Sequence, residues 1–276
     1  MREMITSRQN ERVKALCGLA EKKKRKQSGR FRFDGVKLLR EALLCGIRPV
    51  EVFVRVPETE EIDRLLRRGF QEGLLREEDV VYVSESVFEK LSEEQSPEGV
   101  ITVADYLTEL HRSGEEAPMP EPWERLLIVE AIRDPGNLGT VIRSCAALGI
   151  DRLILSSDCA ELYNPRTVRS TMGALFRLPT LEVAVKELPQ WIESLRRGGR
   201  RVYAAALRED AVAVGSVPLR EGDCFVIGNE GHGLSEATVA ACDGCAVIPM
   251  REGNESLNAA AAAAICIWET VRAGRK

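Results

Sequence analysis

The 276-residue chain lacks several features that define common protein classes. It has no run of about 18 uncharged apolar residues, so no membrane-spanning helix is expected. Its first ten residues, MREMITSRQN, contain no apolar segment of the secretory type, and we therefore expect a cytoplasmic protein. With 44% apolar and 30% charged residues, the chain can bury a sizeable core, and its length suits one large domain or two ordinary ones.

Residue types that bind metals are scarce or scattered. The only histidines are His111 and His232, and the eight cysteines lie mostly in apolar runs, as is typical of buried, reduced thiols. Cys242 and Cys245 form the only CxxC pair, and a zinc site would need a second pair or nearby histidines. We therefore predict no metal site and interpret the pair as core thiols, with a redox motif as the alternative.

The net charge of −4 hides a basic N-terminus. Residues 1–30 contain ten Lys or Arg and three Glu, so the rest of the chain carries a net charge of −11. A basic segment on an acidic body is typical of nucleic-acid-binding proteins, although a solvated helix face also explains a lysine run. The residues predicted to contact RNA are Arg8, Lys22, Lys23, Lys24, Arg25, Lys26 and Arg30.

Residues 1–106 alternate between helical and strand patterns, which predicts a small α/β domain. Helices are expected at 9–25, 36–47, 58–69 and 84–91, and strands at 31–33, 50–56, 80–83 and 99–104. Residues 107–122 contain three prolines and few apolar residues, and this composition predicts a semi-stiff linker.

Residues 123–276 form the second predicted domain, with apolar strands separated by helices. Strands are expected at 126–130, 153–155, 202–206, 225–227 and 246–248, and helices after residue 139, at 185–197, at 234–241 and from about 257. This order favours a parallel sheet covered on both faces. Ligands of such sheets bind beyond the carboxyl ends of the strands, where polar, glycine-bearing loops occur at 133–139, 228–233 and 249–258.

Each loop offers a different chemistry. The first is neither a GxGxxG turn nor a P-loop, and Arg143 on the following apolar helix is expected to be partly buried with an anionic partner. In the second, three glycines allow close approach of a ligand, and His232 is a weak candidate for a general base. In the third, Ser256 is predicted to cap the N-terminus of an Ala-rich helix, which would suit a polar ligand.

Together the three loops carry a family pattern. They read DPGNLGTVIRSCAALG (134–149), VIGNEGHGL (226–234) and IPMREGNESLNAAAA (248–262), with NPRTVRSTMGALFRLP (164–179) between the first two. The chain resembles the SpoU/TrmH-type RNA ribose 2′-O-methyltransferases of the SPOUT class. Its N-terminal part, with RQNERVKALCGL (8–19) and GRFRFDGVKLLREAL (29–43), resembles the substrate-binding domain of such enzymes, which is similar to small ribosomal RNA-binding proteins.

The resemblance implies transfer of a methyl group from S-adenosylmethionine to a ribose 2′-hydroxyl, by a homodimer that pairs through a C-terminal domain with a trefoil knot. We expect ribosomal RNA as the substrate, with tRNA as the alternative, and no membrane or metal. The catalytic positions would be Asn137, Arg143, Glu230, Ser256 and Asn258. Cofactor binding, mainly through backbone groups, would involve Ala205, Leu207, Ile227, Gly228, Asn229, Gly233, Ile248, Met250, Ser256 and Leu257.

The resemblance leaves the role of Arg143 open between a base and a group that stabilises a phosphate or an alkoxide. The second role is physically easier, because a guanidinium resists deprotonation. Two other functions compete with methyl transfer. A non-catalytic RNA-binding protein of the same fold is disfavoured by the joint presence of all five catalytic positions. A Rossmann-type enzyme acting on small molecules is disfavoured by the basic N-terminus and the missing glycine fingerprint.

Overall fold

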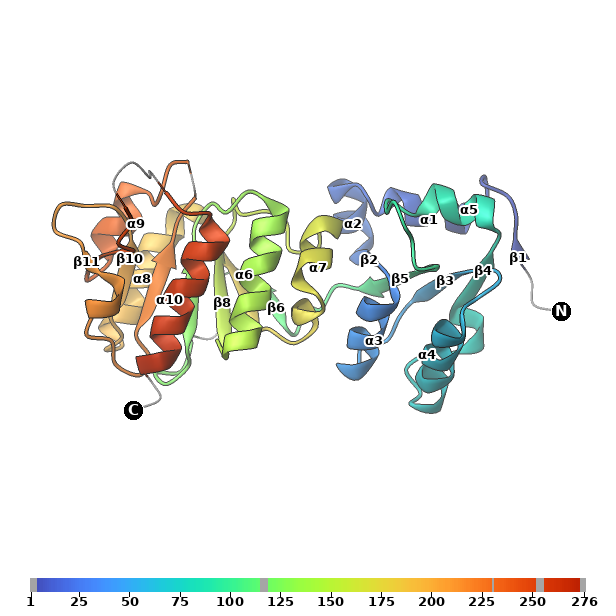
Figure 1. The fold of residues 1–276 in the computed structure, drawn as a ribbon, viewed down its shortest axis with the longest axis horizontal. Helices are drawn as coiled ribbons and strands as arrows, with labels where there is room; N and C mark the ends of the chain where they lie inside the picture. Colours follow the sequence, from blue (N-terminus) through green and yellow to red (C-terminus); the bar gives the residue numbers. More distant parts are fainter. Residues whose placement is uncertain (1–3, 115–118, 230, 252–255, 274–276) are drawn as a thin grey trace. The chain divides into compact units, whose positions relative to one another are not determined.

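The computed structural model describes residues 4–114, 119–229, 231–251 and 256–273. Residue contacts divide the chain into two compact units (Figure 1). The N-terminal unit comprises residues 1–107 and 163–176, and the C-terminal unit comprises residues 108–162 and 177–276. The predicted domain boundaries, 1–106, 107–122 and 123–276, remain a prediction. They describe continuous segments, whereas the contacts group residues 163–176 with the N-terminal unit. None of the helices in the described ranges combines the length and apolar character needed to cross a bilayer.

The N-terminal unit is built on a five-stranded sheet. The strands lie in the order β1 (Met4–Ile5), β4 (Val80–Val83), β3 (Glu51–Arg55), β5 (Val100–Asp105) and β2 (Arg30–Asp34), with β5 antiparallel to both of its neighbours. Helices α1 (Glu11–Gly18) and α5 (Glu85–Leu91) share one apolar cluster with this sheet, and α3 (Val36–Leu44) and α4 (Glu60–Gln71) share another. The α/β prediction is confirmed. The helix expected over 9–25 is instead two helices, α1 and α2 (Lys22–Ser28), with a turn at 19–21 between them.

The segment Tyr163–Phe176, which contains α7 (Pro165–Thr171), packs on strand β2. The ring centroids of Tyr163 and Phe31 lie 4.7 Å apart, and those of Phe176 and Phe33 lie 5.1 Å apart. The backbone N–H of Leu107 donates a hydrogen bond of 2.8 Å to the Tyr163 hydroxyl. This aromatic cluster buries Phe31 and Phe33 of the edge strand β2 under the later segment.

The C-terminal unit contains an eight-stranded sheet in which every strand pair is parallel. Its strands, in spatial order, are β11 (Val212–Ala213), β13 (Gly244–Val247), β10 (Val202–Ala205), β12 (Cys224–Ile227), β7 (Leu126–Val129), β8 (Arg152–Ser156), β9 (Thr180–Val183) and β6 (His111–Ser113). This confirms the predicted parallel sheet, whereas the trefoil knot remains a prediction.

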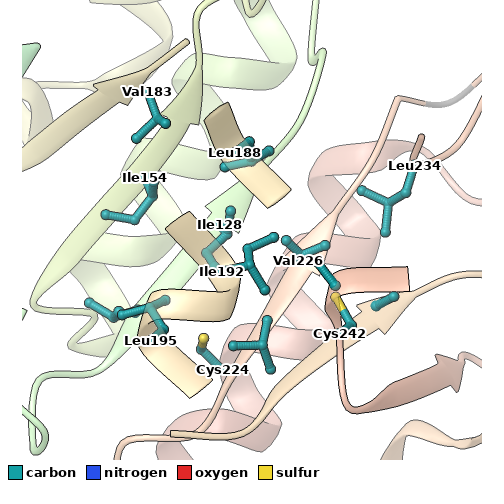
Figure 2. Packing of buried hydrophobic residues seen from close by; sticks show 14 of the residues in the cluster. Ile128, Ile154, Val183, Leu188, Ile192, Leu195, Cys224, Val226, Leu234 and Cys242 are labelled. Carbon is teal, nitrogen blue, oxygen red and sulfur yellow. The ribbon is translucent and has the colours of Figure 1, made fainter. Parts of the chain in front are cut away.

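Helices lie on both faces of this sheet. On one face, α6 (Pro135–Leu148) and α10 (Ala259–Ala273) pack against each other, as Figure 1 shows. On the other, α8 (Leu188–Arg197) and α9 (Glu236–Ala241) pack together over a core whose side chains interdigitate, including Ile128, Ile154, Ile192 and Val226 (Figure 2). The two layers fix the strand ends from which the three polar loops emerge.

Strand β6 lies within the segment predicted to be a linker. It pairs in parallel with β9, where His111 is opposite Thr180 and Ser113 is opposite Glu182. Its sequence, His-Arg-Ser, has neither apolar residues nor alternation, so it carries no strand signal of its own. The linker prediction is therefore wrong for these three residues, because tertiary pairing at the sheet edge decides their conformation.

Candidate ligand-binding and catalytic site

A cavity of about 370 Å³ opens at the carboxyl ends of β10, β12 and β13. Its volume lies in the range of pockets that bind small organic ligands, roughly 300–1,000 Å³. All of the residues predicted to bind the cofactor line it, namely Ala205, Leu207, Ile227, Gly228, Asn229, Gly233, Ile248, Met250, Ser256 and Leu257. Folding thus gathers into one cavity residues that lie up to 52 positions apart in the sequence.

The cavity has exposed apolar side chains around it. Leu207 is 76% exposed, Leu257 is 37% exposed and Met250 is 36% exposed. Large apolar side chains grouped on a surface are typical of ligand-binding sites, since a ligand that covers them removes apolar area from water. Gly228, Asn229, His232 and Gly233 of the second loop line the same cavity.

The loop after β12 turns back tightly against its own strand. The backbone N–H of Gly233 donates to the carbonyl of Asn229 at 2.9 Å, and the N–H of Asn229 donates to the carbonyl of Gly233 at 3.2 Å. A Cβ on Gly228 would lie 2.4 Å from the carbonyl carbon of Gly233 and 2.6 Å from the nitrogen of Leu234. Glycine is therefore required at position 228 by the loop's own backbone, not only by a ligand as the sequence suggested.

Asn229 holds this loop to the end of β7. Its side-chain Nδ2 donates to the carbonyl of Ala131 at 3.0 Å, and its Oδ1 accepts from the N–H of Gly231 at 2.8 Å. Ala131 has a positive φ of 58°, and its N–H donates to Ser156 Oγ at 2.9 Å. A non-glycine residue in this conformation is costly and is held in place by such bonds. Asn229 therefore fixes the shape of the cavity wall through its side chain.

Glu130 does not line the cavity but anchors α9 beside it, a role that sequence reasoning missed. It is 4% exposed, and its Oε2 accepts from the N–H of Ser235 at 3.0 Å. Its Oε1 accepts from the hydroxyls of Ser235 at 2.8 Å and Thr238 at 3.0 Å. A carboxylate is well placed at the start of α9, because the N-terminus of a helix carries partial positive charge. The available signal was an acidic residue directly after the buried run LLIV.

The first and third loops meet at a pair of asparagines. Asn258 Nδ2 donates to Asn137 Oδ1 at 3.0 Å, across 121 positions of sequence. Asn258 Oδ1 also accepts from the N–H of Ala260 at 3.0 Å and of Ala261 at 3.3 Å, so Asn258 caps α10. The prediction that Ser256 is the cap is wrong, because α10 begins at Ala259 and Asn258 directly precedes it. Ser256 lines the cavity instead.

This asparagine pair joins the N-termini of two long helices. Helix α6 has 14 residues, and Asn137 lies in its first turn, where its N–H donates to the capping side chain of Asp134 at 2.8 Å. Helix α10 has 15 residues and begins directly after Asn258. Each N-terminus carries a partial positive charge, so the region between the first and third loops favours bound or developing negative charge.

Arg143 does not lie where the sequence suggested. It is exposed, whereas Ile142 and Cys145 beside it on α6 are fully buried. Neighbouring residues of a helix point about 100° apart, so an apolar neighbour does not imply burial. Arg143 lies about 9 Å along the helix from Asn137 and does not line the cavity. Within the described residues it makes no hydrogen bond or ion pair. Glu230 lies outside the described residues.

The CxxC pair belongs to the core. Cys242 and Cys245 both lie in the apolar cluster beneath α8 and α9 and are free thiols. Burial raises the pKa of Cys242 to about 12 and also raises the pKa of Cys245. A redox motif needs a thiol whose pKa is lowered, so this environment disfavours the redox alternative.

The predicted RNA-contacting residues fall into three groups. Lys22, Lys23, Lys24 and Lys26 are exposed on α2. Arg30 pairs with Asp105 at 3.1 Å and Arg8 with Glu89 at 3.7 Å, both at the surface. Arg25 is 1% exposed, and its guanidinium donates to the carbonyls of Leu19 and Ala20. The structure therefore contradicts the prediction that Arg25 contacts RNA, because its donors are buried and bound to backbone.

Two family models match the chain. The SpoU rRNA Methylase family matches residues 124–268, and the MRM3-like substrate binding domain matches residues 10–102. The 23S rRNA (guanosine(2553)-2′-O)-methyltransferase RlmP of Bacillus subtilis is 30% identical over 96% of this chain and 98% of its own. The 23S rRNA (uridine(2479)-2′-O)-methyltransferase of Streptomyces viridochromogenes is 30% identical over 97% and 91%.

A solved structure has the same fold. The AdoMet-bound rRNA methyltransferase from Sinorhizobium meliloti superposes with a TM-score of 0.81 at 26% sequence identity. The alignment covers 98% of this chain and 97% of that one. The likeness therefore includes both units and not only the parallel sheet.

The tight loop at Gly228 gives a first testable prediction. Gly228→Ala should lower the free energy of unfolding by roughly 1–3 kcal/mol, because the added carbon forces the backbone at residues 233–234 to move. Gly215→Ala is the matched control, since a Cβ there meets nothing within 4 Å, and its effect should stay within about 0.5 kcal/mol. Urea denaturation measures both, and equal stabilities would contradict the proposed loop constraint.

Proposed function

This chain belongs to the SpoU rRNA methylase family, and we propose that it transfers a methyl group from S-adenosylmethionine to a ribose 2′-hydroxyl of ribosomal RNA. One observation carries the proposal: the cavity at the carboxyl ends of β10, β12 and β13 lies beside the Asn137–Asn258 junction, and Ser256, Leu257 and Ala259 at the start of α10 line it. A ligand site and a site for developing negative charge therefore share one helix end.

The cavity residues fit S-adenosylmethionine. Leu207, Met250 and Leu257 offer an apolar surface to an adenine ring, and the backbone groups at 227–229 and 248 offer hydrogen bonds to its polar atoms. The bound cofactor supplies a methyl group on a positively charged sulfur. Asn229 and Glu130 support the site from behind, because their bonds to Ala131 and to the start of α9 hold the loop that forms its wall.

The reacting hydroxyl needs help from the protein. A ribose hydroxyl is a poor nucleophile near neutral pH, so negative charge develops on its oxygen as its proton passes to solvent water. The two helix N-termini joined by Asn137 and Asn258 are fixed dipoles that stabilise such charge without reorganising. Holding the oxygen in line with the methyl group can contribute roughly a further 7–11 kcal/mol. We assign Ser256 and Glu230 to positioning the ribose, and Arg143 to stabilising a phosphate or the developing alkoxide.

The substrate follows from the relatives and from the N-terminal unit. Two relatives with the same 30% identity are named for a guanosine and for a uridine of 23S rRNA, and the group common to both is the ribose. The match to a substrate-binding domain over residues 10–102 includes the exposed lysines of α2. We therefore propose rRNA over tRNA, and the cytoplasm, where ribosomal RNA is found in bacteria, as the place of action.

The direct test is transfer of tritium from labelled S-adenosylmethionine into 23S rRNA, followed by mapping of 2′-O-methyl groups.

The Arg143→Ala variant should fold normally and bind S-adenosylmethionine as well as wild type, while its rate of methyl transfer falls by about 10². Ser144→Ala, the next residue on α6, is the control and should keep its rate. Label found in tRNA alone would make tRNA the substrate in place of rRNA. RNA binding without label would favour the non-catalytic alternative. Wild-type turnover by Arg143→Ala would remove Arg143 from the site.

The charge on α2 predicts how RNA binding depends on salt. Replacing Lys22, Lys23, Lys24 and Lys26 with Ala should weaken binding and flatten the plot of log affinity against log salt. The expected change is about 0.7–0.9 log units of slope per lost phosphate contact. Replacing Arg64 and Arg67, which lie on α4 of the same unit, is the control and should leave the slope unchanged. An unaltered slope in the lysine variant would mean that these lysines are only solvated.

We also propose that the chain forms a homodimer through its C-terminal unit. Helix α10 exposes Ala261 and 48% of Trp268, with Ile265 half-buried between them, on one side of the helix. The stripe lies on the helix that packs against α6, which carries Arg143. Pairing there would cover Trp268 and bring a second chain next to the catalytic helices.

Trp268→Glu should convert the dimer to a monomer, because a buried, unpaired carboxylate is strongly unfavourable at an apolar interface. Trp123→Glu is the control, since Trp123 is 61% exposed and lies outside α10. Sedimentation equilibrium of the full-length chain at micromolar concentration distinguishes the two. A wild-type chain that sediments as a monomer, or a Trp268→Glu variant that remains dimeric, contradicts this interface.

A further inference from the structure

Helix α2 is unfavourable by local rules. Its seven residues are KKKRKQS, with three lysines in the first turn and no acidic residue there. Glu21 at the N-cap makes no side-chain capping bond. Cations at a helix N-terminus oppose the helix dipole, and helices this short are marginal in isolation. A tertiary contact must therefore hold α2 in place.

Arg25 makes one such contact, and α2 also contacts strand β2. Arg25 is the buried residue of α2, and its Nη1 donates to the carbonyl of Leu19 at 2.8 Å and to that of Ala20 at 2.7 Å. Leu19 is the C-cap of α1, where carbonyl groups carry partial negative charge. Helix α1 is itself fixed, because Val13 and Leu16 are almost fully buried in the core under α5. A continuous series of contacts thus runs from the core through α1 and Arg25 to α2.

The other side of α2 is a dense cationic surface. Lys22, Lys23, Lys24 and Lys26 are exposed, and within the described part of the chain they form no ion pair. Four such ammonium groups on seven residues repel one another, so they suit a polyanion that neutralises them together. The phosphate backbone of RNA is such a polyanion.

We propose that Arg25 is a positioning residue for the RNA substrate: by binding the end of α1, it sets the orientation in which α2 presents its four lysines to RNA phosphates. The proposal rests on the proposed function and assigns part of its substrate-binding surface. A guanidinium suits this task, because its donors form a rigid fork that can reach two adjacent carbonyls. The ammonium of a lysine sits on a flexible stem, so it would fix the direction of two such bonds less well.

A double-mutant cycle on the full-length protein tests the coupling. RNA affinity is measured at low salt, at a temperature where circular dichroism shows every variant to be folded. Arg25→Gln should lower the affinity by about tenfold, the loss expected for one or two misplaced phosphate contacts. Affinity for S-adenosylmethionine and turnover at saturating RNA should stay within about twofold, so KM changes and kcat does not.

The decisive variant combines Arg25→Gln with the four Lys→Ala replacements. If Arg25 acts by orienting the lysines, its effect on RNA affinity disappears when they are absent. Arg32→Gln is the matched control, because Arg32 is a buried arginine of the same unit that pairs with Asp34 at 2.7 Å, and within the described residues no hydrogen bond or ion pair joins it to α2. It should lower stability without changing RNA affinity. Arg25→Lys, which keeps the charge and part of the donor set, should fall between wild type and Arg25→Gln.

Three outcomes overturn the proposal. Unchanged RNA affinity in Arg25→Gln leaves Arg25 a purely structural residue. An equal loss in the presence and absence of the lysines means that Arg25 acts elsewhere, and equal losses in Arg25→Gln and Arg32→Gln mean that stability alone is responsible. The proposed function is judged separately, because wild-type methyl transfer to RNA stands or falls without reference to Arg25.

Discussion

The hydrogen bond between Asn258 and Asn137 is the constraint on which the candidate site depends. A parallel sheet places the loops after its strands at one edge, but it does not fix how those loops face one another. Asn258 does so with both ends of one amide: its nitrogen binds Asn137 and its oxygen caps α10. A carboxylate could accept the helix N–H groups but could not donate to Asn137. The amide therefore locks two helix N-termini together without adding a negative charge where negative charge must develop.

The two units divide the work between affinity and chemistry. Lysine contacts to phosphate carry no sequence information, and they supply affinity that falls with salt. In the proposed function, the cavity and the paired helix ends act on a small cofactor and on the ribose, through fixed dipoles and close packing that salt affects little. The same catalytic unit can thus serve different RNA sites in different relatives, as the names of two equally similar relatives illustrate.

The sequence predicts the apolar strands and the loops that follow them well, because buried parallel strands read as continuous apolar runs. It therefore also predicts the cavity, since the motif residues flank those strand ends. It fails where tertiary packing decides. Arg143 was expected to be partly buried and Arg25 exposed, and the structure reverses both. In a run such as KKKRK, nothing in the spacing shows which cation will face inward. The carbonyls of Leu19 and Ala20, which accept from Arg25, decide it. Strand β6, with its polar sequence, is missed for the same reason.

Local rules are broken beside each of the two proposed binding surfaces. In the C-terminal unit, Ala131 takes a positive φ of 58°, a conformation that costs a non-glycine residue roughly 1–3 kcal/mol. Bonds from Ser156 and Asn229 to its N–H and carbonyl hold it there, and the same bonds attach the cavity wall to β7. In the N-terminal unit, lysines occupy the wrong end of a helix, and Arg25 holds that helix in place. A sequence selected for stability alone would use glycine at 131 and acidic residues at the start of α2. Both unfavourable features are offset by specific hydrogen bonds. Such exceptions to local rules are expected where a ligand, rather than stability, determines the sequence.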